Sequence, residues 1–320
     1  MQSNAGRNRQ IASDITMHVS VIICTHNPRP EYLQRTLLAL KEQTLPATQW
    51  ELLLIDNASR EPLAQGWDLS WLPQARIVRE EELGLTHARL RGIRESAGHI
   101  LAFVDDDNLL EQEYLAHAVR IAEERPDIGA WGGEILGEFE EELPEWLEPH
   151  VECLAVRALK RDAWSNLYGW SPALPIGAGI CLRREVTEHY AGLCVGHPLR
   201  RNLDRRGASL GCGGDVDMAY CAIDMAMGLG RFKCLRLLHL IPRNRLQREY
   251  VLGVISGARS AAVLVDSLRE ETRRIRPDGR SLWCNIHFLR QWLRAGSFER
   301  SVLVAAYRGE ELAWRLLGGS

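Results

Sequence analysis

Apolar runs of strand length alternate with segments of helical period over roughly the first 135 residues. Residues 19–24, 50–55 and 100–104 are almost entirely apolar, which is typical of strands covered by helices on both faces of a sheet. Between and after them, residues 86–96 and 114–122 have the spacing of amphipathic helices. Strands that alternate with helices through right-handed crossovers predict an α/β fold built on a mostly parallel, open sheet.

The pattern becomes less regular after this region. A charged loop, several tryptophans and an arginine-rich stretch follow, and we expect this part to shape the pocket of a second substrate. Helical patterns then dominate the C-terminal part without a hinge rich in turn residues. The predicted divisions are a flexible tail (1–16), a main domain (17–245, with halves 17–135 and 136–245) and a helical C-terminal region (246–320).

Polar side chains stand at the carboxyl ends of the predicted strands. Thr25 follows the first strand, Asp56 the second, and Asp105, Asp106 and Asp107 follow the strand at 100–104. Because such ends line one edge of a parallel sheet, we expect these residues to meet in one crevice. Three adjacent carboxylates repel one another unless a cation or hydrogen-bond donors lie among them, so a hard divalent metal is one interpretation. An acidic turn that caps the next helix is the other.

Composition narrows the classes of partner. The net charge of −3 gives no reason to expect nucleic acid. We identify no stretch of about 18 to 20 apolar residues and no signal-peptide core. The eight cysteines lack Cys-x-x-Cys spacing, which favours reduced thiols in a cytoplasmic protein. A zinc site with Cys212 and Cys221 is a weaker alternative.

Segments in a fixed order resemble the inverting family 2 glycosyltransferases with the GT-A (nucleotide-diphospho-sugar transferase-like) fold. These segments are Val19 to Asn27, Leu53 to Ser59, Gly84 to Gly92 and Phe103 to Asp107. The resemblance covers about residues 17–250, most firmly the first 110. It implies an inverting transferase that moves one hexose-type sugar from a nucleoside diphosphate, most simply UDP.

The same resemblance implies donor and metal contacts. Asp56 matches an acidic residue that hydrogen-bonds the nucleotide base, in a pocket that Thr25 and Asn27 line. The DxD element faces the ribose and a Mn²⁺ or Mg²⁺ ion on the diphosphate. Within this element, Asp105 and Asp106 are expected to bind the nucleotide sugar. Asp107 is expected to bind the metal ion together with His239. Arg91 is expected to reach a phosphate or a carboxylate. Alternatively, Arg91 is a solvated charge on a helix. For His239 the alternative is a buried position in the core.

An acceptor-side element is implied at Gly213 to Asp217, which looks like the family's Gly-Glu-Asp-x-Asp sequence. Asp215 matches the general base, with Asp217 and Asp224 as substitutes and a plain helix cap as the alternative. The chain departs from the family where Gly214 replaces a glutamate. Acceptor contacts are therefore expected from Gly179, Gly214 and Asp217. Exposed tryptophans in this half could stack on a sugar or pack in the core.

The expected acceptor is a glycan or a lipid-linked glycan. The stretch Gln247-Arg248-Glu249-Tyr250 does not match the Gln-x-x-Arg-Trp element of processive synthases, so we expect transfer of one sugar per encounter. Basic side chains in the C-terminal part are compatible with peripheral contact to an anionic membrane, or with a solvated face. They are Arg273, Arg274, Arg276, Arg280, Arg290 and Arg294. A catalytically inactive protein that binds sugar nucleotides or glycans is the alternative function.

Overall fold

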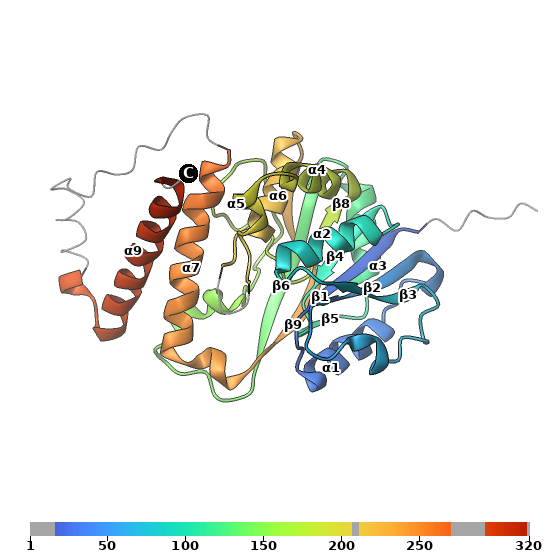
Figure 1. Ribbon diagram of the computed structural model, residues 1–320, viewed down its shortest axis with the longest axis horizontal. Coiled ribbons are helices and arrows are strands. Elements are labelled where there is room, and N and C mark those ends of the chain that lie inside the picture. The colour runs from blue at the N-terminus through green and yellow to red at the C-terminus, as the bar shows by residue number, and fades with distance from the viewer. Residues whose placement is uncertain (1–16, 207–210, 270–291, 319–320) are drawn as a thin grey trace, which may run out of the picture.

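The computed structural model describes residues 17–206, 211–269 and 292–318 (Figure 1). The predicted tail at 1–16 and the arginines at 273, 274, 276, 280 and 290 lie outside these residues. The first half contains β1 (Val19–Thr25), α1 (Pro30–Lys41), β2 (Trp50–Asn57), β3 (Ala75–Glu80), α2 (Leu85–Glu95), β4 (Ile100–Val104), β5 (Asn108–Leu110) and α3 (Tyr114–Glu124). Short 3-10 helices stand at Ala47–Gln49 and Leu63–Gln65.

The second half begins with a strand of 12 residues. It contains β6 (Ile128–Phe139), β7 (Ala163–Ser165), β8 (Ile180–Arg183), α4 (Arg184–Cys194), α5 (Pro198–Arg201), α6 (Gly214–Asp224), β9 (Gly228–Ile241), α7 (Arg248–Ser267) and α9 (Ser297–Gly318). The 3-10 helices η3 (Glu148–Leu154) and η4 (Arg243–Leu246) connect these elements.

One sheet of nine strands runs through the described residues, in the order β3-β2-β1-β4-β8-β6-β9-β5, with β7 paired to β9. The strands β3, β2, β1 and β4 are parallel, as predicted. The second half is mixed, because β8 runs antiparallel to both of its neighbours. The reason is the path of the chain: Ile180 pairs with Phe103 at the carboxyl end of β4, so β8 starts at that edge and runs back.

Both faces of the sheet are covered, which explains the continuous apolar strands. Val21 and Ile23 of β1 belong to a core with side chains of α1 and α3, whereas Ile22 belongs to a second core with side chains of α2, α4 and α6. Alternating side chains point to opposite faces of a strand, so each strand here contributes to both cores. The predicted α/β fold is therefore confirmed.

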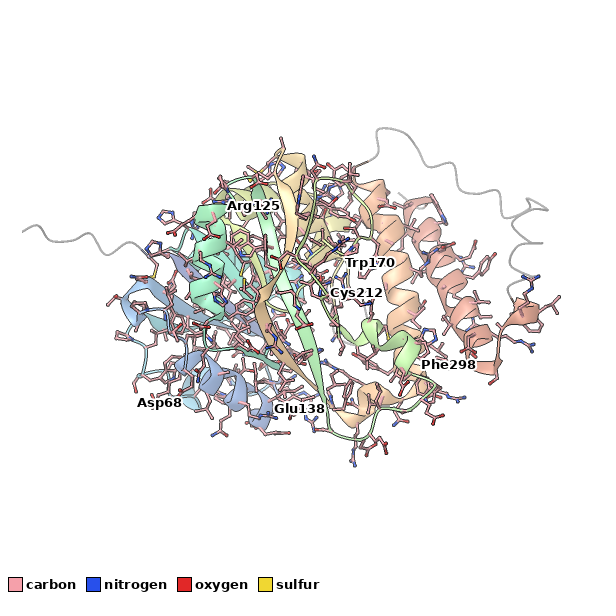
Figure 2. All side chains as sticks on the ribbon, turned by 180° about the vertical axis from the view of Figure 1, so that it is seen from behind. Asp68, Arg125, Glu138, Trp170, Cys212 and Phe298 are labelled. Carbon is pink, nitrogen blue, oxygen red and sulfur yellow. The ribbon has the colours of Figure 1, made fainter. Side chains whose placement is uncertain are left out.

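The C-terminal helices α7 and α9 lie side by side at the end of the molecule away from β3 (Figure 1). A third core joins them to the main domain through Phe298, labelled in Figure 2, whose ring centroid lies 4.4 Å from that of Trp146. The sequence prediction of no membrane-length apolar segment needs correction, because α7 is long and apolar enough by length and composition alone. Only 33% of that window is buried in the protein, and one such helix is weak support for a membrane span.

The two helices approach each other closely at Gly309. A Cβ atom built at this position would lie 2.1 Å from the backbone oxygen of Ser256 on α7, so even alanine has no room there. Gly192 in α4 is a matched control, because no atom lies within 4 Å of a Cβ built at that position.

We predict that Gly309→Ala destabilises the protein by about 1–3 kcal/mol, since overpacking forces the helices apart. Gly192→Ala should leave the free energy of unfolding unchanged or raise it by up to about 1 kcal/mol through helix propensity. Urea denaturation of both variants measures the difference. Equal stability of the two variants would mean that α9 does not pack on α7 in this way.

Candidate active site

The strand ends meet at one edge as the sequence predicted. Thr25 is paired with Asp56 across β1 and β2, and Ile23 with Val104 across β1 and β4. This register places the acidic triplet beside Thr25, whose hydroxyl donates a hydrogen bond to the carboxylate of Asp106. Parallel pairing therefore suffices to bring these residues into one crevice.

Asp56 is fully buried, and both of its oxygens already accept hydrogen bonds. Oδ1 accepts from the backbone N–H of Ser59 at 3.1 Å, and Oδ2 from the N–H of Leu63 at 3.1 Å and from Arg79 at 2.7 Å. Burial by itself raises the pKa of Asp56, but these hydrogen bonds outweigh it and lower the pKa. In this arrangement Asp56 orders the loop that follows β2. Its contact with a nucleotide base stays a prediction.

Asn27 is exposed beside this loop. It has a positive φ of 49°, a conformation that asparagine tolerates better than most residues. Its backbone N–H donates to the Ser59 hydroxyl at 2.9 Å, and its side-chain oxygen accepts from the N–H of Arg60 at 2.9 Å. Asn27 therefore joins the loops after β1 and β2, which would form the two sides of a nucleotide pocket.

The three aspartates of the triplet have different environments. Burial, and then the negative charge of Asp107, raises the pKa of Asp105 and raises that of Asp106 to about 7. Burial also acts against ionisation of Asp107, but the charge and hydrogen bond of His239 and the charge of Arg245 lower its pKa to about 2. Asp107 therefore carries the firmly ionised carboxylate of the triplet.

Asp107 and His239 converge on one cation, the guanidinium group of Arg245. A nitrogen of Arg245 lies 3.0 Å from Asp107 Oδ2 and 3.1 Å from His239 Nε2, and these two atoms are 3.5 Å apart. The strand pairing of Asn108 with His239 sets this geometry. No cluster of three or more His, Cys, Asp and Glu side chains suited to a metal occurs in the part of the chain that the structure describes.

The donor set nevertheless fits a small divalent cation. Mg²⁺ and Mn²⁺ prefer oxygen and imidazole ligands, and such ions often keep only one or two protein ligands beside substrate phosphates. The convergence of a carboxylate and an imidazole on a positive group is the arrangement that such a site needs. Arg245 was missed in the sequence, where nothing distinguished it from its neighbours.

On the acceptor side, Asp215 stands in the first turn of α6 and is partly exposed. Its Oδ2 accepts a hydrogen bond from the Gly177 N–H at 2.7 Å, and its Oδ1 from the Val216 N–H at 2.9 Å. Burial raises the pKa of Asp215, while the positive charge of Arg89 works in the opposite direction. The carboxylate is therefore more basic than a solvated one.

The arginine near Asp215 is Arg89, which the sequence analysis did not single out as a site residue. Arg89 is buried, and its guanidinium donates to Asp204 at 2.7 Å. The pKa of Arg89 is raised: burial lowers it, but the charges of Asp204, Asp215 and Asp105 outweigh burial. Arg91 instead forms an ion pair with Glu95 one helical turn away, at 3.0 Å. The two arginines are two positions apart on α2, so they point to different sides of the helix.

Gly177 faces the site more directly than the predicted Gly179. A Cβ built at Gly177 would lie 3.0 Å from Arg89 and 3.3 Å from Asp215. Gly179 has a φ of +73°, and a Cβ there would collide with Leu237 and Tyr114, so glycine at this position is explained by core packing. Gly214 faces Asp204, whose carboxylate lies 2.1 Å from its notional Cβ.

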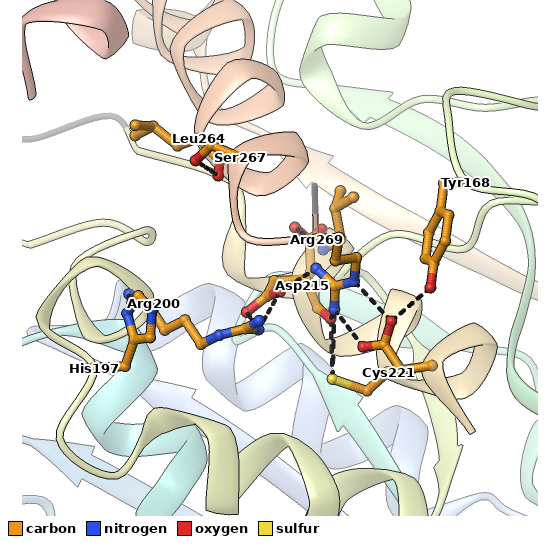
Figure 3. A network of polar contacts seen from close by, with 11 residues as sticks. Tyr168, His197, Arg200, Asp215, Cys221, Leu264, Ser267 and Arg269 are labelled. Atoms are coloured by element: carbon orange, nitrogen blue, oxygen red, sulfur yellow. Dashed lines mark hydrogen bonds and ion pairs between the residues drawn. The ribbon is translucent and has the colours of Figure 1, made fainter. Parts of the chain in front are cut away.

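Asp217 does not face the crevice. It is fully buried, and it forms ion pairs with Arg200 at 2.6 Å and with Arg269. The two guanidinium groups reach α6 from opposite sides, and Arg269 also contacts Asp224 (Figure 3). The expectation of acceptor binding by Asp217 is therefore replaced by a structural role. Breaking such a buried pair costs about 3–5 kcal/mol.

Comparisons with known proteins agree with this geometry. Residues 20–190 match the family model described as glycosyl transferase family 2. Glycosyltransferase AglE of Haloferax volcanii is 35% identical over 104 residues, which cover 32% of this chain and 34% of that protein. Glucosyl-dolichyl phosphate glucuronosyltransferase of the same organism is 25% identical over 132 residues, covering 41% and 42%. The match thus spans less than half the length of either relative.

A solved structure shows the same fold. The crystal structure of GalNAc-T7 with UDP, GalNAc and Mn²⁺ superposes with a TM-score of 0.51 at 17% identity, over 78% of this chain and 52% of that one. At this identity the likeness establishes the architecture alone. Since the family model matches more than half of the 320 residues, the chain belongs to glycosyl transferase family 2 and has the GT-A fold.

Proposed function

We propose that this chain transfers a single sugar, with inversion, from a nucleoside diphosphate sugar to a hydroxyl group of a glycan or lipid-linked glycan. The observation that carries the proposal is the position of Arg89. Its guanidinium lies within electrostatic range of Asp105 on the donor side and of Asp204 and Asp215 on the acceptor side. Donor-side and acceptor-side carboxylates therefore surround one buried cation in a common crevice.

Asp215 is the general base in this proposal. Direct displacement at an anomeric carbon requires removal of the acceptor hydroxyl's proton as the new bond forms, opposite the leaving diphosphate. At the start of α6, the helix dipole and the N–H of Val216 favour the ionised form of this carboxylate. Hydrogen bonding to Gly177 fixes its orientation.

Donor and acceptor classes rest on relatives as well as on the site. The GalNAc-T7 structure contains UDP and Mn²⁺, and one relative is named for a dolichyl phosphate substrate. These names support a UDP-sugar donor and a lipid-linked acceptor for this chain. The seven described cysteines are free thiols, which supports action in the cytoplasm. Exposed apolar side chains one turn apart on α9, Leu312 and Leu316, favour peripheral contact with a membrane.

Asp107 and His239 would hold the divalent metal, with Asp105 and Asp106 directed to the sugar nucleotide. A bound Mn²⁺ or Mg²⁺ ion supplies Lewis-acid stabilisation of charge on the leaving phosphate. Arg245, released from Asp107, would remain close enough to pair with the same diphosphate. The chain's own contribution is to place the metal ion and the guanidinium group of Arg245 where negative charge develops on the leaving diphosphate.

We predict that Asp215→Asn lowers the rate of sugar transfer by about 10²–10⁴-fold, because the acceptor proton then has no base. Binding of UDP-sugar, measured by calorimetry, should change by less than about twofold. The exposed Asp127, ion-paired with Arg125, provides the same substitution far from the crevice, and Asp127→Asn should retain full activity. A protein that binds donors but transfers no sugar, before as well as after the substitution, would instead be the inactive binding protein.

The pH profile follows from the raised pKa of Asp215. Only the ionised form accepts a proton, so kcat falls as the pH drops through this pKa. Because an ordinary Asp carboxyl has a pKa of about 3.9, we expect the acidic limb of the profile above that value. Stopped assays from about pH 3 to about pH 8, a range that includes the ordinary Asp value, measure it. An acidic limb at or below the ordinary pKa of Asp would mean that the surroundings of Asp215 do not raise its pKa.

We predict that Asp107→Asn weakens Mn²⁺ binding in the presence of UDP by at least about tenfold, since the ion loses its ionised ligand. Electron paramagnetic resonance of free Mn²⁺ gives the affinity without an activity assay. Asp127→Asn is again the control and should bind as the unaltered protein does. Retained affinity in Asp107→Asn would place the metal elsewhere.

Thermal shift with a panel of sugar nucleotides, with and without Mn²⁺, identifies the donor. A ligand that binds only the folded chain raises its melting temperature by an amount that grows with the logarithm of the ligand concentration over Kd. We expect one UDP-sugar to give the largest rise, and only with the metal present. No shift with any sugar nucleotide would overturn the proposal.

A further inference from the structure

A carboxylate occupies the space of the side chain that Gly214 lacks. A Cβ atom built at Gly214 would lie 2.1 Å from Oδ2 and 2.5 Å from Cγ of Asp204. Asp204 precedes Gly214 by ten residues and is 5% exposed. A side chain at position 214 and the carboxyl group of Asp204 therefore cannot occupy this space together. In this chain the carboxyl group of Asp204 occupies it.

Asp204 ties two parts of the site together. Its Oδ1 accepts a hydrogen bond from the Gly214 N–H at 2.9 Å, at the start of α6. Its Oδ2 accepts from Arg89 at 2.7 Å and from the Thr86 hydroxyl at 3.0 Å, both on α2. A buried carboxylate with three donors and a buried guanidinium partner has a fixed position.

Arg89 lies between two carboxylates. It forms its ion pair with Asp204 and, among the described residues, forms none with Asp215. It is nevertheless close to Asp215. A Cβ atom built at Gly177 would lie 3.0 Å from the guanidinium group of Arg89 and 3.3 Å from the carboxylate of Asp215. The charged and titratable groups around Asp215 are Arg89 on α2, Asp204 after α5, Cys212 before α6, and Arg157.

We propose that Asp204 is a positioning residue for the base: it fills the place of a side chain at 214, fixes the start of α6, and holds Arg89 away from a direct ion pair with Asp215. This inference rests on the proposed role of Asp215 as the general base. Without Asp204, the guanidinium would turn to the remaining carboxylate. An Asp215 paired with Arg89 is a weaker base and is less accessible to an acceptor hydroxyl.

The first test is Asp204→Asn, which keeps an oxygen for the Gly214 N–H but removes the charge that holds Arg89. We expect kcat to fall at least about tenfold with donor Kd unchanged, and the acidic limb of the pH profile to move to lower pH by about half a unit or more. A residue that only stabilises the fold would change the yield or melting temperature of the protein and leave the profile in place. An unmoved profile overturns the inference.

Exchanging the carboxylate between the two positions provides the second test. Asp204→Ala loses the carboxylate, and Gly214→Asp alone collides with it, so each single variant should be impaired in transfer or folding. The double variant with both substitutions restores one carboxylate in nearly the same space, so we expect activity within about tenfold of the unaltered protein. A double variant no better than the poorer single one contradicts the proposal, even if Asp204→Asn fails to fold.

A readout without turnover separates this inference from the proposed function. The carboxyl carbon of Asp215 can be titrated by ¹³C NMR and assigned by its absence in Asp215→Asn. If its pKa falls in Asp204→Asn, Asp204 sets the basicity of Asp215, through its own charge as well as through Arg89, even where no sugar is transferred, and only the transferase proposal fails. If the pKa is unchanged in a protein that does transfer sugar, the transferase proposal stands and the positioning role is wrong.

Discussion

The site depends on balancing several buried or partly buried carboxylates with two guanidinium groups. Asp105, Asp106 and Asp107 follow one strand, and Asp204 and Asp215 approach from the other side. Like charges at such short range cannot all be ionised without cations among them. Arg89 and Arg245 supply these cations within the chain, one between the two halves of the crevice and one beside Asp107.

This balance also distributes chemical roles. Asp107, next to His239 and Arg245, remains ionised and suits a cation, whereas burial makes Asp215 more basic. A single type of side chain thus suits the two proposed roles, metal ligand for Asp107 and general base for Asp215, through environment alone. Asp56, satisfied by Arg79 and two backbone N–H groups, instead orders the loop after β2.

The second half of the sheet gives this chemistry its geometry. Because β8 starts at the carboxyl end of β4, the segment just before it, with Gly177, lies at the same edge as the aspartates. The helix α6 is then held by the Asp217 ion pairs to Arg200 and Arg269, which fix the direction of its first turn (Figure 3). The position of Asp215 therefore depends on a buried network far from any substrate.

The sequence by itself determined the α/β architecture and the meeting of the polar strand ends at one edge of the sheet. Strand periodicity and turn residues are local signals, and parallel pairing brings the ends of neighbouring strands together without further information, as for Thr25 and the aspartate triplet. The alternation of apolar runs was sufficient for this part because each run is buried on both faces.

Only the tertiary structure decided the acceptor side and the charge pairing. Arg89 and Arg91 look alike in a helical pattern, and the choice between them depends on which side of α2 meets Asp204. Asp204 lies in a loop and Arg245 in the short 3-10 helix η4, where the sequence has no periodicity, and Asp217 differs from Asp215 only by its rotation around α6. Contacts between residues that are distant in sequence carry no local signal, so burial and ion pairing could be assigned only once the elements were packed.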